Sequence, residues 1–474
     1  MDLKKIVFLT SIFLVLFTYT ANAQTEKDSV YFTTGFKIGE VSQSSVIIWT
    51  RLCKSAKPVP VWHERQDKTF RFPKKFDNNM PVKDMDGAVE GAFGQVKIEL
   101  FSANDTIVVD WAYVSALQDY TLKKKIEGLN PNTHYTVRLR GRKGEDLPET
   151  KAFGEFFTAP NKDEVVPVLF TSSTCQLFWS HDDPERGFKI YDEMKKLKPR
   201  FHSQTGDYVY YDKPGPFVKT IEMARHKWHA MNSWPSLKEF YRHTPLYIEK
   251  DDHDLLRDDA YPGSKPLGEL TFEDGLALWY EQTPIGEKPY RTARWGKDLQ
   301  VWFVEVREFR SDNRIEDSKD KTIWGKEQIA WFKETLEASD ATFKVLVSPT
   351  PVVGPDRPKG KNDNHSNKAF QTEGAWLRAY LAKHEVFVVN GDRHWQYASV
   401  DPVTGLREFS QGAVSDYHAG GWSQDNVKPE HKFLRVKGGF LATKVYREKG
   451  IPIIEFLHYD VDGNVVNKET FRNK

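Results

Sequence analysis

Four short segments of the chain carry side chains that can bind metal ions. They hold a cysteine, a tyrosine, histidines and aspartates, and they are Ser172–Gln176, Gly206–Tyr210, Asp251–Asp254 and Asn390–Trp395. Carboxylates and phenolates suit hard cations, whereas thiolates and imidazoles suit softer ones. Three of the segments follow an apolar or β-rich run, so these groups are expected at strand ends. The pattern therefore indicates a site that holds metal ions.

The second and third segments supply carboxylates. Asp207 can bridge two cations, and Tyr210, three residues later, can bind an oxidised metal as a phenolate. The alternative for this segment alone is a plain Gly-Asp turn. In the third segment three acids surround His253, an arrangement that is costly to bury without a cation. The alternative there is an exposed acidic turn.

The fourth and first segments add a histidine and a thiol. Asp392 and His394 come directly after the apolar run Val386–Val389, and both side chains can reach a metal if the backbone turns there. Cys175 follows a predicted strand, and a coordinated thiol loses its proton. Taken alone, His394 would be structural and Cys175 a buried thiol. The four segments together favour the metal site.

Such a site predicts hydrolysis of phosphate esters. Two or three cations polarise a phosphoryl group and lower the pKa of bound water from 15.7 to about 7. We therefore expect in-line attack by metal-bound hydroxide without a covalent enzyme intermediate, and His253 can donate a proton to the leaving oxygen. Guanidinium groups pair bidentately with phosphate, or with surface acids as the alternative. The candidates are Arg257, Arg393, Arg307 and Arg310.

Two further places are expected to contact substrate. The polar loop 361–367 contains acids, amides and a histidine, and we predict that Asn364 and His365 reach the site as part of a lid. A solvated loop is the alternative with similar weight. Asp258 extends the acidic cluster of the third segment and would change the charge presented to the substrate.

The segments lie in a region that alternates between strands and helices. Apolar runs predict strands, and periodic patterns predict one helix over residues 183–197 and another that begins near Thr322. This alternation over residues 161–474 indicates a layered α/β or α+β domain with ligand groups at strand ends.

Residues 24–160 have a different character. Short runs rich in Val, Ile, Thr, Phe and Tyr recur between turn signals, which predicts an all-β domain. The stretch Ile126–Tyr135 resembles the corner of a fibronectin-type sandwich, in which a tyrosine caps the turn. We predict an immunoglobulin/fibronectin-like sandwich, with the polar stretch Lys54–Gly91 as a long insertion.

Composition excludes several classes of protein. The chain has 474 residues, of which 39% are hydrophobic, so it can bury a large core and is not disordered. Its net charge of +1 gives no nucleic-acid-binding signature. Cys53 and Cys175 fall in different predicted domains, which argues against a disulfide between them.

The first residues predict export. Two lysines precede the apolar run Ile6–Phe17, and Ala21–Ala23 fits a signal-peptide cleavage site, so residues 1–23 are predicted to be a signal peptide. A membrane anchor is the alternative, but the run is shorter than the ~20 residues that a span needs. No later segment is long and apolar enough to be a transmembrane span. We expect a periplasmic or secreted protein.

Taken together, the segments resemble the PhoD-type alkaline phosphatases, a branch of the calcineurin-like metallophosphoesterases. The resemblance runs from about Val30 to the C-terminus. The segments that carry it are Ser45–Leu52, Gly206–Tyr210, Asp251–Asp254, Val304–Asp312, Gly325–Gln328 with Trp331, and Gly391–Trp395.

The resemblance implies a fold and a metal set. It implies a four-layer α/β/β/α metallophosphoesterase domain over residues 161–474, with iron(III) and calcium or with zinc, manganese or magnesium. Asp207 would bridge the metals, and His253 and His394 would contact metal, phosphate or leaving group. The implied metal ligands are Cys175, Asp207, Tyr210, Asp252, Asp392 and His394. Asp258 stands where the family often has asparagine.

We therefore expect an exported metal-dependent hydrolase of phosphomonoesters or phosphodiesters, with a small-molecule or polymeric substrate. The alternative is a non-catalytic secreted β-sandwich binding protein whose second domain is a degenerate phosphatase. The intact set of ligands argues against this alternative, because a cluster of acids without metal is destabilising.

Overall fold

The computed structural model describes residues 28–65, 72–357 and 363–473, and the predicted signal peptide lies outside them. Within these ranges the strands form three sheets. Sheet I has the order β20-β19-β18-β8-β9-β10-β1-β2-β5, sheet II the order β11-β12-β13-β14-β16-β15-β17, and sheet III the order β4-β3-β6-β7.

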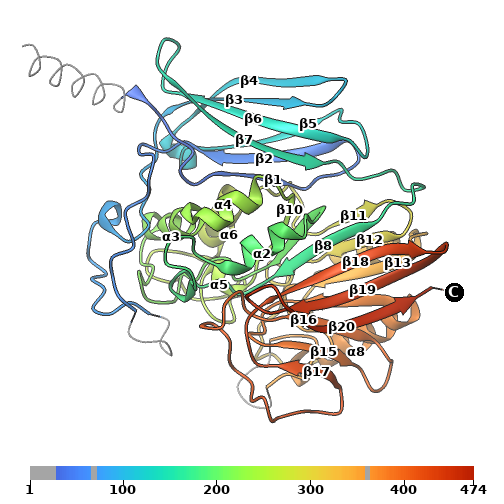
Figure 1. Cartoon of the computed structure of the whole chain (residues 1–474). Coiled ribbons are helices and arrows are strands. Elements are labelled where there is room, and N and C mark those ends of the chain that lie inside the picture. Colours follow the sequence, from blue (N-terminus) through green and yellow to red (C-terminus); the bar gives the residue numbers. More distant parts are fainter. Residues whose placement is uncertain (1–27, 66–71, 358–362, 474) are drawn as a thin grey trace, which may run out of the picture.

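The N-terminal region is a β domain, as predicted. Its apolar side chains alternate along the strands, and those of sheet III meet those of β1, β2 and β5 in one core (Figure 1). The strands are β1 (Phe36–Gly39), β2 (Ser45–Arg51), β3 (Gly94–Phe101), β4 (Thr106–Val114), β5 (Thr121–Glu127), β6 (His134–Arg142) and β7 (Glu149–Phe157). The short helices η1 (Val82–Asp84) and η2 (Ala116–Gln118) lie between them.

The predicted tyrosine corner is confirmed. Leu129 and Tyr135 are buried, and the Tyr135 hydroxyl accepts a hydrogen bond of 3.0 Å from the Asn130 backbone N–H. The hydroxyl therefore satisfies a backbone donor at the turn, which fixes the entry into β6.

The β domain shares a sheet with the rest of the molecule. Strand β1 pairs in parallel with β10 through Gly39 and Leu246, so sheet I crosses from one region into the other. A Cβ on Gly39 would lie 2.4 Å from the Pro284 carbonyl oxygen, so the close approach requires glycine there. Asp119 strengthens the junction, since its carboxylate accepts a hydrogen bond of 2.7 Å from Gln282. No pattern in the sequence predicts this continuity.

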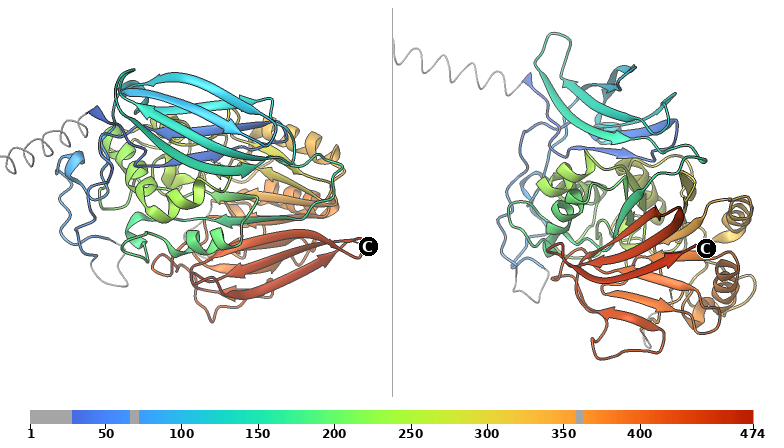
Figure 2. Two further views of the ribbon diagram at one scale, coloured as in Figure 1. Left: turned by 45° about the horizontal axis from the view of Figure 1, so that its top comes forward. Right: turned by 45° about the vertical axis from the view of Figure 1, so that its right-hand side comes forward.

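Sheets I and II face one another beyond the β domain (Figure 2). The apolar cluster between them includes Phe170, Phe201, Val345 and Phe456. The remaining strands of sheet I are β8 (Val168–Ser173), β9 (Phe201–Thr205), β10 (Leu246–Glu249), β18 (Phe440–Glu448), β19 (Ile451–Tyr459) and β20 (Val465–Arg472). Those of sheet II are β11 (Arg291–Trp295), β12 (Leu299–Phe303), β13 (Phe343–Ser348), β14 (Val386–Asn390), β15 (Gln396–Val400), β16 (Arg407–Gln411) and β17 (His431–Arg435).

Helices cover the outer faces of both sheets. Next to sheet I lie η3 (Phe178–Ser180), α2 (Lys189–Lys196), α3 (Ile221–Ser233), α4 (Pro235–Tyr241), α5 (Asp252–Leu255) and α6 (Phe272–Gln282). Next to sheet II lie α7 (Gly325–Glu337), η4 (Lys368–Phe370) and α8 (Gln371–Lys383). None of the helices in the described ranges is long and apolar enough to cross a membrane.

Helix α2 is shorter than predicted. The sequence predicts a helix over residues 183–197, but α2 begins at Lys189. Residues Asp183 and Gly187 instead exchange backbone hydrogen bonds of 2.9 Å, and Gly187 has a φ of +100°. That left-handed conformation breaks the helical path before α2. The second predicted helix is confirmed, since the Thr322 hydroxyl accepts from the Gly325 N–H at 2.8 Å, at the start of α7.

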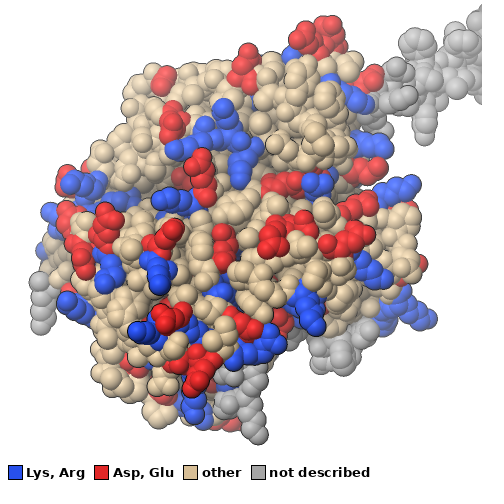
Figure 3. Space-filling model, turned by 180° about the vertical axis from the view of Figure 1, so that it is seen from behind, with Lys and Arg blue, Asp and Glu red and all other residues tan. Residues whose placement is uncertain are grey.

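The surface is mixed in charge. On the face seen in Figure 3, acidic and basic side chains lie interspersed over an otherwise uncharged surface. This agrees with the net charge of +1.

A buried histidine makes the stability of the fold dependent on pH. His202 on β9 is inaccessible, and its ring nitrogens lie 2.9 Å from the Thr171 hydroxyl and 3.0 Å from the Ser173 hydroxyl. Burial lowers its pKa from 6.5 to about 3, so it stays neutral in the folded state. The unfolded chain takes up this proton first, so the stability contributed by His202 is complete above pH 6.5 and is lost as the pH falls towards 3.

We predict that acidification from pH 7 to pH 5 removes about 2 kcal/mol of stability through His202, since each pKa unit corresponds to about 1.4 kcal/mol. Denaturant unfolding at the two pH values checks this. The variant His202→Gln should show a smaller difference between them, whereas His134→Gln, on the exposed face of β6, should behave like the wild type. An equal pH dependence in His202→Gln and wild type would contradict the assignment.

Candidate metal centre

The four predicted segments meet at the carboxyl ends of strands. Strands β8, β9 and β10 run parallel in sheet I, and β14 of sheet II ends beside them, where the Asp392 N–H donates to the Thr174 hydroxyl at 3.3 Å. Cys175 follows β8, Asp207 follows β9, and Asp392 follows β14. Their φ angles are +55°, +56° and +62°, a region that residues other than glycine seldom adopt. Such strain persists where the surrounding structure holds functional side chains in place.

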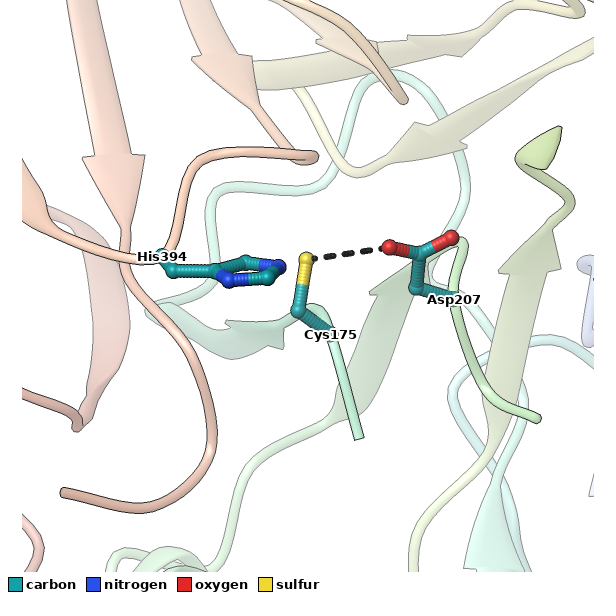
Figure 4. A group of neighbouring side chains, drawn as sticks. All are labelled: Cys175, Asp207 and His394. Carbon is teal, nitrogen blue, oxygen red and sulfur yellow. Dashed lines mark hydrogen bonds between the residues drawn. The ribbon is translucent and has the colours of Figure 1, made fainter. Parts of the chain in front are cut away.

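Cys175, Asp207 and His394 form one ligand group. Their ligand atoms lie within 4.8 Å of one another, and the Cys175 sulfur lies 3.4 Å from Asp207 Oδ2. Figure 4 shows the Asp207 carboxylate and the His394 ring both directed towards that sulfur. Tyr210 joins the group, because its hydroxyl donates to Asp207 Oδ2 at 2.9 Å. The structure therefore brings these predicted ligands together.

Asp207, Asp252 and His253 form a second group. Their ligand atoms also lie within 4.8 Å of one another, and all three side chains are buried. Asp207 belongs to both groups, which is the placement expected of a carboxylate that bridges two cations.

The buried acids fit a metal centre. Asp207 Oδ1, Asp251 Oδ2 and Asn390 Oδ1 are buried, and within the described part of the chain they have no hydrogen-bond partner. Burial raises the pKa values of Asp207 and Asp251 well above the usual range; His253 and Arg307 oppose this rise, and neighbouring carboxylates add to it. Burial also raises the pKa of Cys175. Cations would offset this cost by supplying positive charge to these buried oxygens and the thiol.

His418 is a site residue that the sequence analysis did not single out. Its Nδ1 lies 2.9 Å from the Cys175 carbonyl oxygen, and its ring centre lies 4.2 Å from that of His394 and 5.2 Å from that of Tyr210. A histidine whose Nδ1 is held by a backbone carbonyl presents Nε2 to a metal. His418 lies in the polar, glycine-rich stretch 415–422, and that composition was the one available sign of a pocket-lining segment.

Two acids support the ligands from behind. The Asp254 carboxylate accepts backbone N–H bonds from Asp207 (2.7 Å), Val209 (2.9 Å) and Asp251 (3.0 Å), which fixes the two ligand-bearing loops relative to each other. Asp212 lies 2.7 Å from His253 Nδ1. Sequence reasoning missed both roles, because each depends on a contact with another part of the chain.

Neighbouring charges determine the direction of the pKa shifts of His253 and Asp212. Burial alone would lower its pKa, but the carboxylates of Asp252, Asp207 and Asp212 raise it to about 10. Burial alone would raise the pKa of Asp212, but His253 and Lys213 lower it to about 2. Asp258 is exposed, and its Oδ1 lies 3.8 Å from His253 Nε2, so it flanks the opposite side of the ring.

The candidate arginines are engaged with protein groups. Arg393 is inaccessible, and one of its nitrogens lies 2.7 Å from Asp356 and 3.4 Å from Asp363. It also pairs with Asp392. Arg307 is inaccessible as well and pairs with Asp251. These guanidinium groups therefore hold carboxylates in position, and their contact with phosphate stays a prediction.

The remaining candidates also bind protein groups. Arg310 donates to the Asp363 carbonyl at 2.8 Å, and Arg257 donates to the Lys265 carbonyl at 3.1 Å. Asn364 and His365 are inaccessible, so the structure does not place them on a substrate-facing lid. Asn364 donates to Asp356 at 2.8 Å, and His365 lies 2.8 Å from Glu373 on α8. Residues 361 and 362 of the predicted loop lie outside the described residues.

Both parts of the chain match models of the same kind of phosphatase. Residues 170–438 match the family PhoD-like phosphatase, and residues 19–160 match the family PhoD-like phosphatase, N-terminal domain. Alkaline phosphatase D of Bacillus subtilis (strain 168) is 23% identical over 380 residues, which are 69% of this chain and 57% of that protein. The match thus spans less than two thirds of that relative.

Solved structures agree on the fold. A structure of PhoD superposes with a TM-score of 0.69 at 17% identity, covering 93% of this chain and 90% of the other. The purple acid phosphatase PPD1 from yellow lupin seeds gives 0.60 at 10% identity, covering 94% and 74%. The family match covers more than half of the chain, and the predicted ligand segments lie at the strand ends, so the chain belongs to the PhoD-like phosphatase family.

Proposed function

We propose that the protein is a metal-dependent phosphoric-ester hydrolase that acts on phosphomonoesters and phosphodiesters. The observation that carries the proposal is the pair of ligand groups that share Asp207. Cations bound there would polarise a phosphoryl group. They would also lower the pKa of bound water, so that hydroxide is available to attack phosphorus. The names of the related phosphatases support the same reaction class.

The chain's own residues would bind the cations and move a proton. Cys175, Asp207, Tyr210, His394 and His418 would hold one cation. The second group of cations would be held by Asp207, Asp252, Asp392 and Asn390. His253 would donate a proton to the leaving oxygen, because Asp212 fixes its Nδ1 and leaves Nε2 on the side of Asp258.

We propose iron(III) for the first group and calcium for the second. A thiolate, a phenolate and imidazoles together suit iron, and the phenolate favours its oxidised form. Carboxylate and amide oxygens suit calcium, which takes oxygen ligands. Zinc, manganese or magnesium would be the alternative outcomes of elemental analysis.

Tyr210 allows a spectroscopic test of the metal. Iron(III) bound to a phenolate absorbs visible light by charge transfer, so purified protein should be coloured. The variant Tyr210→Phe should lose or shift this absorption while it keeps its fold. The variant Tyr113→Phe, at an exposed position of the β domain, is the matched control and should keep the wild-type spectrum. A metal-loaded wild type without a visible band would rule out an iron(III) phenolate.

One experiment tests the function. Elemental analysis of the purified protein would be combined with assays of p-nitrophenyl phosphate and bis-p-nitrophenyl phosphate on the same sample. Stoichiometric metal with turnover supports the proposal, and the ratio of the two rates separates monoesterase from diesterase activity. No metal and no turnover, even after metals are added back, would refute it and favour a non-catalytic binding protein.

We further propose export, with domains at residues 24–160 and 161–474. Support for export comes from the apolar run Ile6–Phe17 and the alanines before Gln24. The mass of protein recovered outside the cytoplasm should correspond to a chain that begins at Gln24. The tyrosine corner supports a fibronectin-like sandwich, and the helices outside sheets I and II support a four-layer second domain.

A further inference from the structure

A long insertion of the β domain lies against helices and loops that surround the candidate metal centre. We call residues 54–91 the arm; it leaves the domain after β2 and returns at β3, and its described parts are 54–65 and 72–91. Figures 1 and 2 show this blue segment running beside helix α3. Val61, Phe76 and Met80 pack on the apolar core of the helices, which anchors the arm to the second region.

An internal clasp holds the arm in shape. The Asp86 carboxylate is buried, lies 2.6 Å from His63 Nδ1 and accepts the backbone N–H groups of Trp62 (2.6 Å) and His63 (2.9 Å). These bonds fix the chain two residues before Arg65.

Arg65 reaches the loop that carries His418. Its guanidinium carbon lies 4.4 Å from the centre of the Tyr417 ring, a distance typical of a cation–π contact. The same guanidinium donates to the His181 carbonyl oxygen at 2.9 Å. Tyr417 directly precedes His418, whose ring contacts the Cys175 carbonyl, so Arg65 contacts the loop one residue before a candidate ligand.

Asn78 reaches the loop that carries Asp212. Its side-chain amide donates to the Phe217 carbonyl and accepts from the Phe217 N–H, both at 2.8 Å. Trp179 adds a bond of 2.7 Å to the Gly215 carbonyl. A Cβ on Gly215 would lie 2.1 Å from the indole nitrogen, so this loop is held tightly. Asp212 in turn holds His253.

We propose that the arm is a positioning element of the active site: Arg65 orients His418 through Tyr417, and Asn78 orients the Asp212–His253 pair through Phe217. The inference rests on the proposed function. Its physical basis is that groups that orient metal ligands change metal affinity or activity by 10–100-fold when they are lost. Two contacts from one arm reach two loops: one loop carries His418, and the other carries Asp212, which holds His253.

The test compares the full-length metal-loaded protein with Arg65→Ala and Asn78→Ala. For Arg65→Ala we expect faster metal release to a chelator and about 10–100-fold lower kcat. For Asn78→Ala we expect a similar fall in kcat with metal release unchanged, because Asp212 touches His253 rather than the first ligand group. Lys74→Ala is the control, since Lys74 lies in the arm and pairs with the exposed Glu64. It should match the wild type.

A double-mutant cycle separates positioning from general support. If Arg65 acts through His418, then adding Arg65→Ala to His418→Ala should change metal release little further. Fully additive effects would overturn the proposal, as would wild-type metal release and kcat in Arg65→Ala. Tyr417→Phe keeps the ring and should retain metal, whereas Tyr417→Ala should behave like Arg65→Ala. Metal release is measured without substrate. It therefore tests the positioning role even when the wild type binds metal and hydrolyses neither ester.

Discussion

Replacing Asp207 by asparagine is expected to lower kcat/KM by roughly 1,000-fold or more and to remove bound metal. Asp207 is the side chain common to both ligand groups, so its loss weakens two cation sites at once. Loss of a single group that supports a metal ligand lowers metal affinity or activity by about 10–100-fold, and two such losses multiply. Steady-state kinetics on p-nitrophenyl phosphate and elemental analysis of the same sample measure both effects.

Thermal unfolding gives Asp207→Asn a second readout. Bound ligand stabilises a folded protein by about 2.7 kcal/mol at a hundred times its Kd, so a chelator should lower the Tm of the wild type. The variant should show almost no such shift. Without metal it should be at least as stable as the wild type, because Asp207 Oδ1 is buried and has no hydrogen-bond partner among the described residues. Asp110→Asn, at an exposed carboxylate on β4, is the matched control. Normal metal content in Asp207→Asn would contradict the bridging role.

Replacing His253 by glutamine is expected to lower kcat by about 100- to 10,000-fold on alkyl phosphates, the range typical of a general acid. The loss should be much smaller on p-nitrophenyl phosphate, because p-nitrophenolate leaves readily without a proton. Geometry supports His253 as the proton donor. Asp212 holds its Nδ1 at 2.7 Å, so Nε2 is the nitrogen available to the leaving oxygen. Paired assays with both substrates measure the difference.

Metal content distinguishes a proton donor from a ligand at His253. The ring lies in a ligand group with Asp207 and Asp252, so a ligand role predicts metal loss in His253→Gln, whereas the proton-donor role predicts normal metal content. Asp212→Asn should show a milder loss, about 10–100-fold, with the same dependence on the leaving group. Equal losses on alkyl and aryl esters would exclude proton donation by His253.

The strand-end ligands could be predicted from the sequence because their signals are local. An apolar run followed by Gly-Asp or Asp-Asp-His places polar side chains at a strand end whatever the rest of the chain does. Cys175, Asp207 and His394 are therefore found together, as predicted. The corner at Tyr135 is equally local, because donor and acceptor lie five residues apart.

The long-range contacts could not be predicted in this way. Asn364 and His365 had the composition of a lid, yet they are buried and bind Asp356 and Glu373. Arg393 had the chemistry of a phosphate contact, yet it faces carboxylates. A polar side chain satisfies whichever partner the fold brings near, and its own type does not identify that partner.

Short segments were enough to predict the alternation of strands and helices, the β domain and the metal-binding character of the chain, because hydrophobic period, turn residues and ligand chemistry are local properties. Three features emerge only when the chain is folded: sheet I continues from the β domain through Gly39 and Leu246, His418 contacts the Cys175 carbonyl, and Asp212 holds His253. Each of these pairs is separated by more than 40 residues. Their meeting depends on the packing of whole elements, and no short segment encodes it.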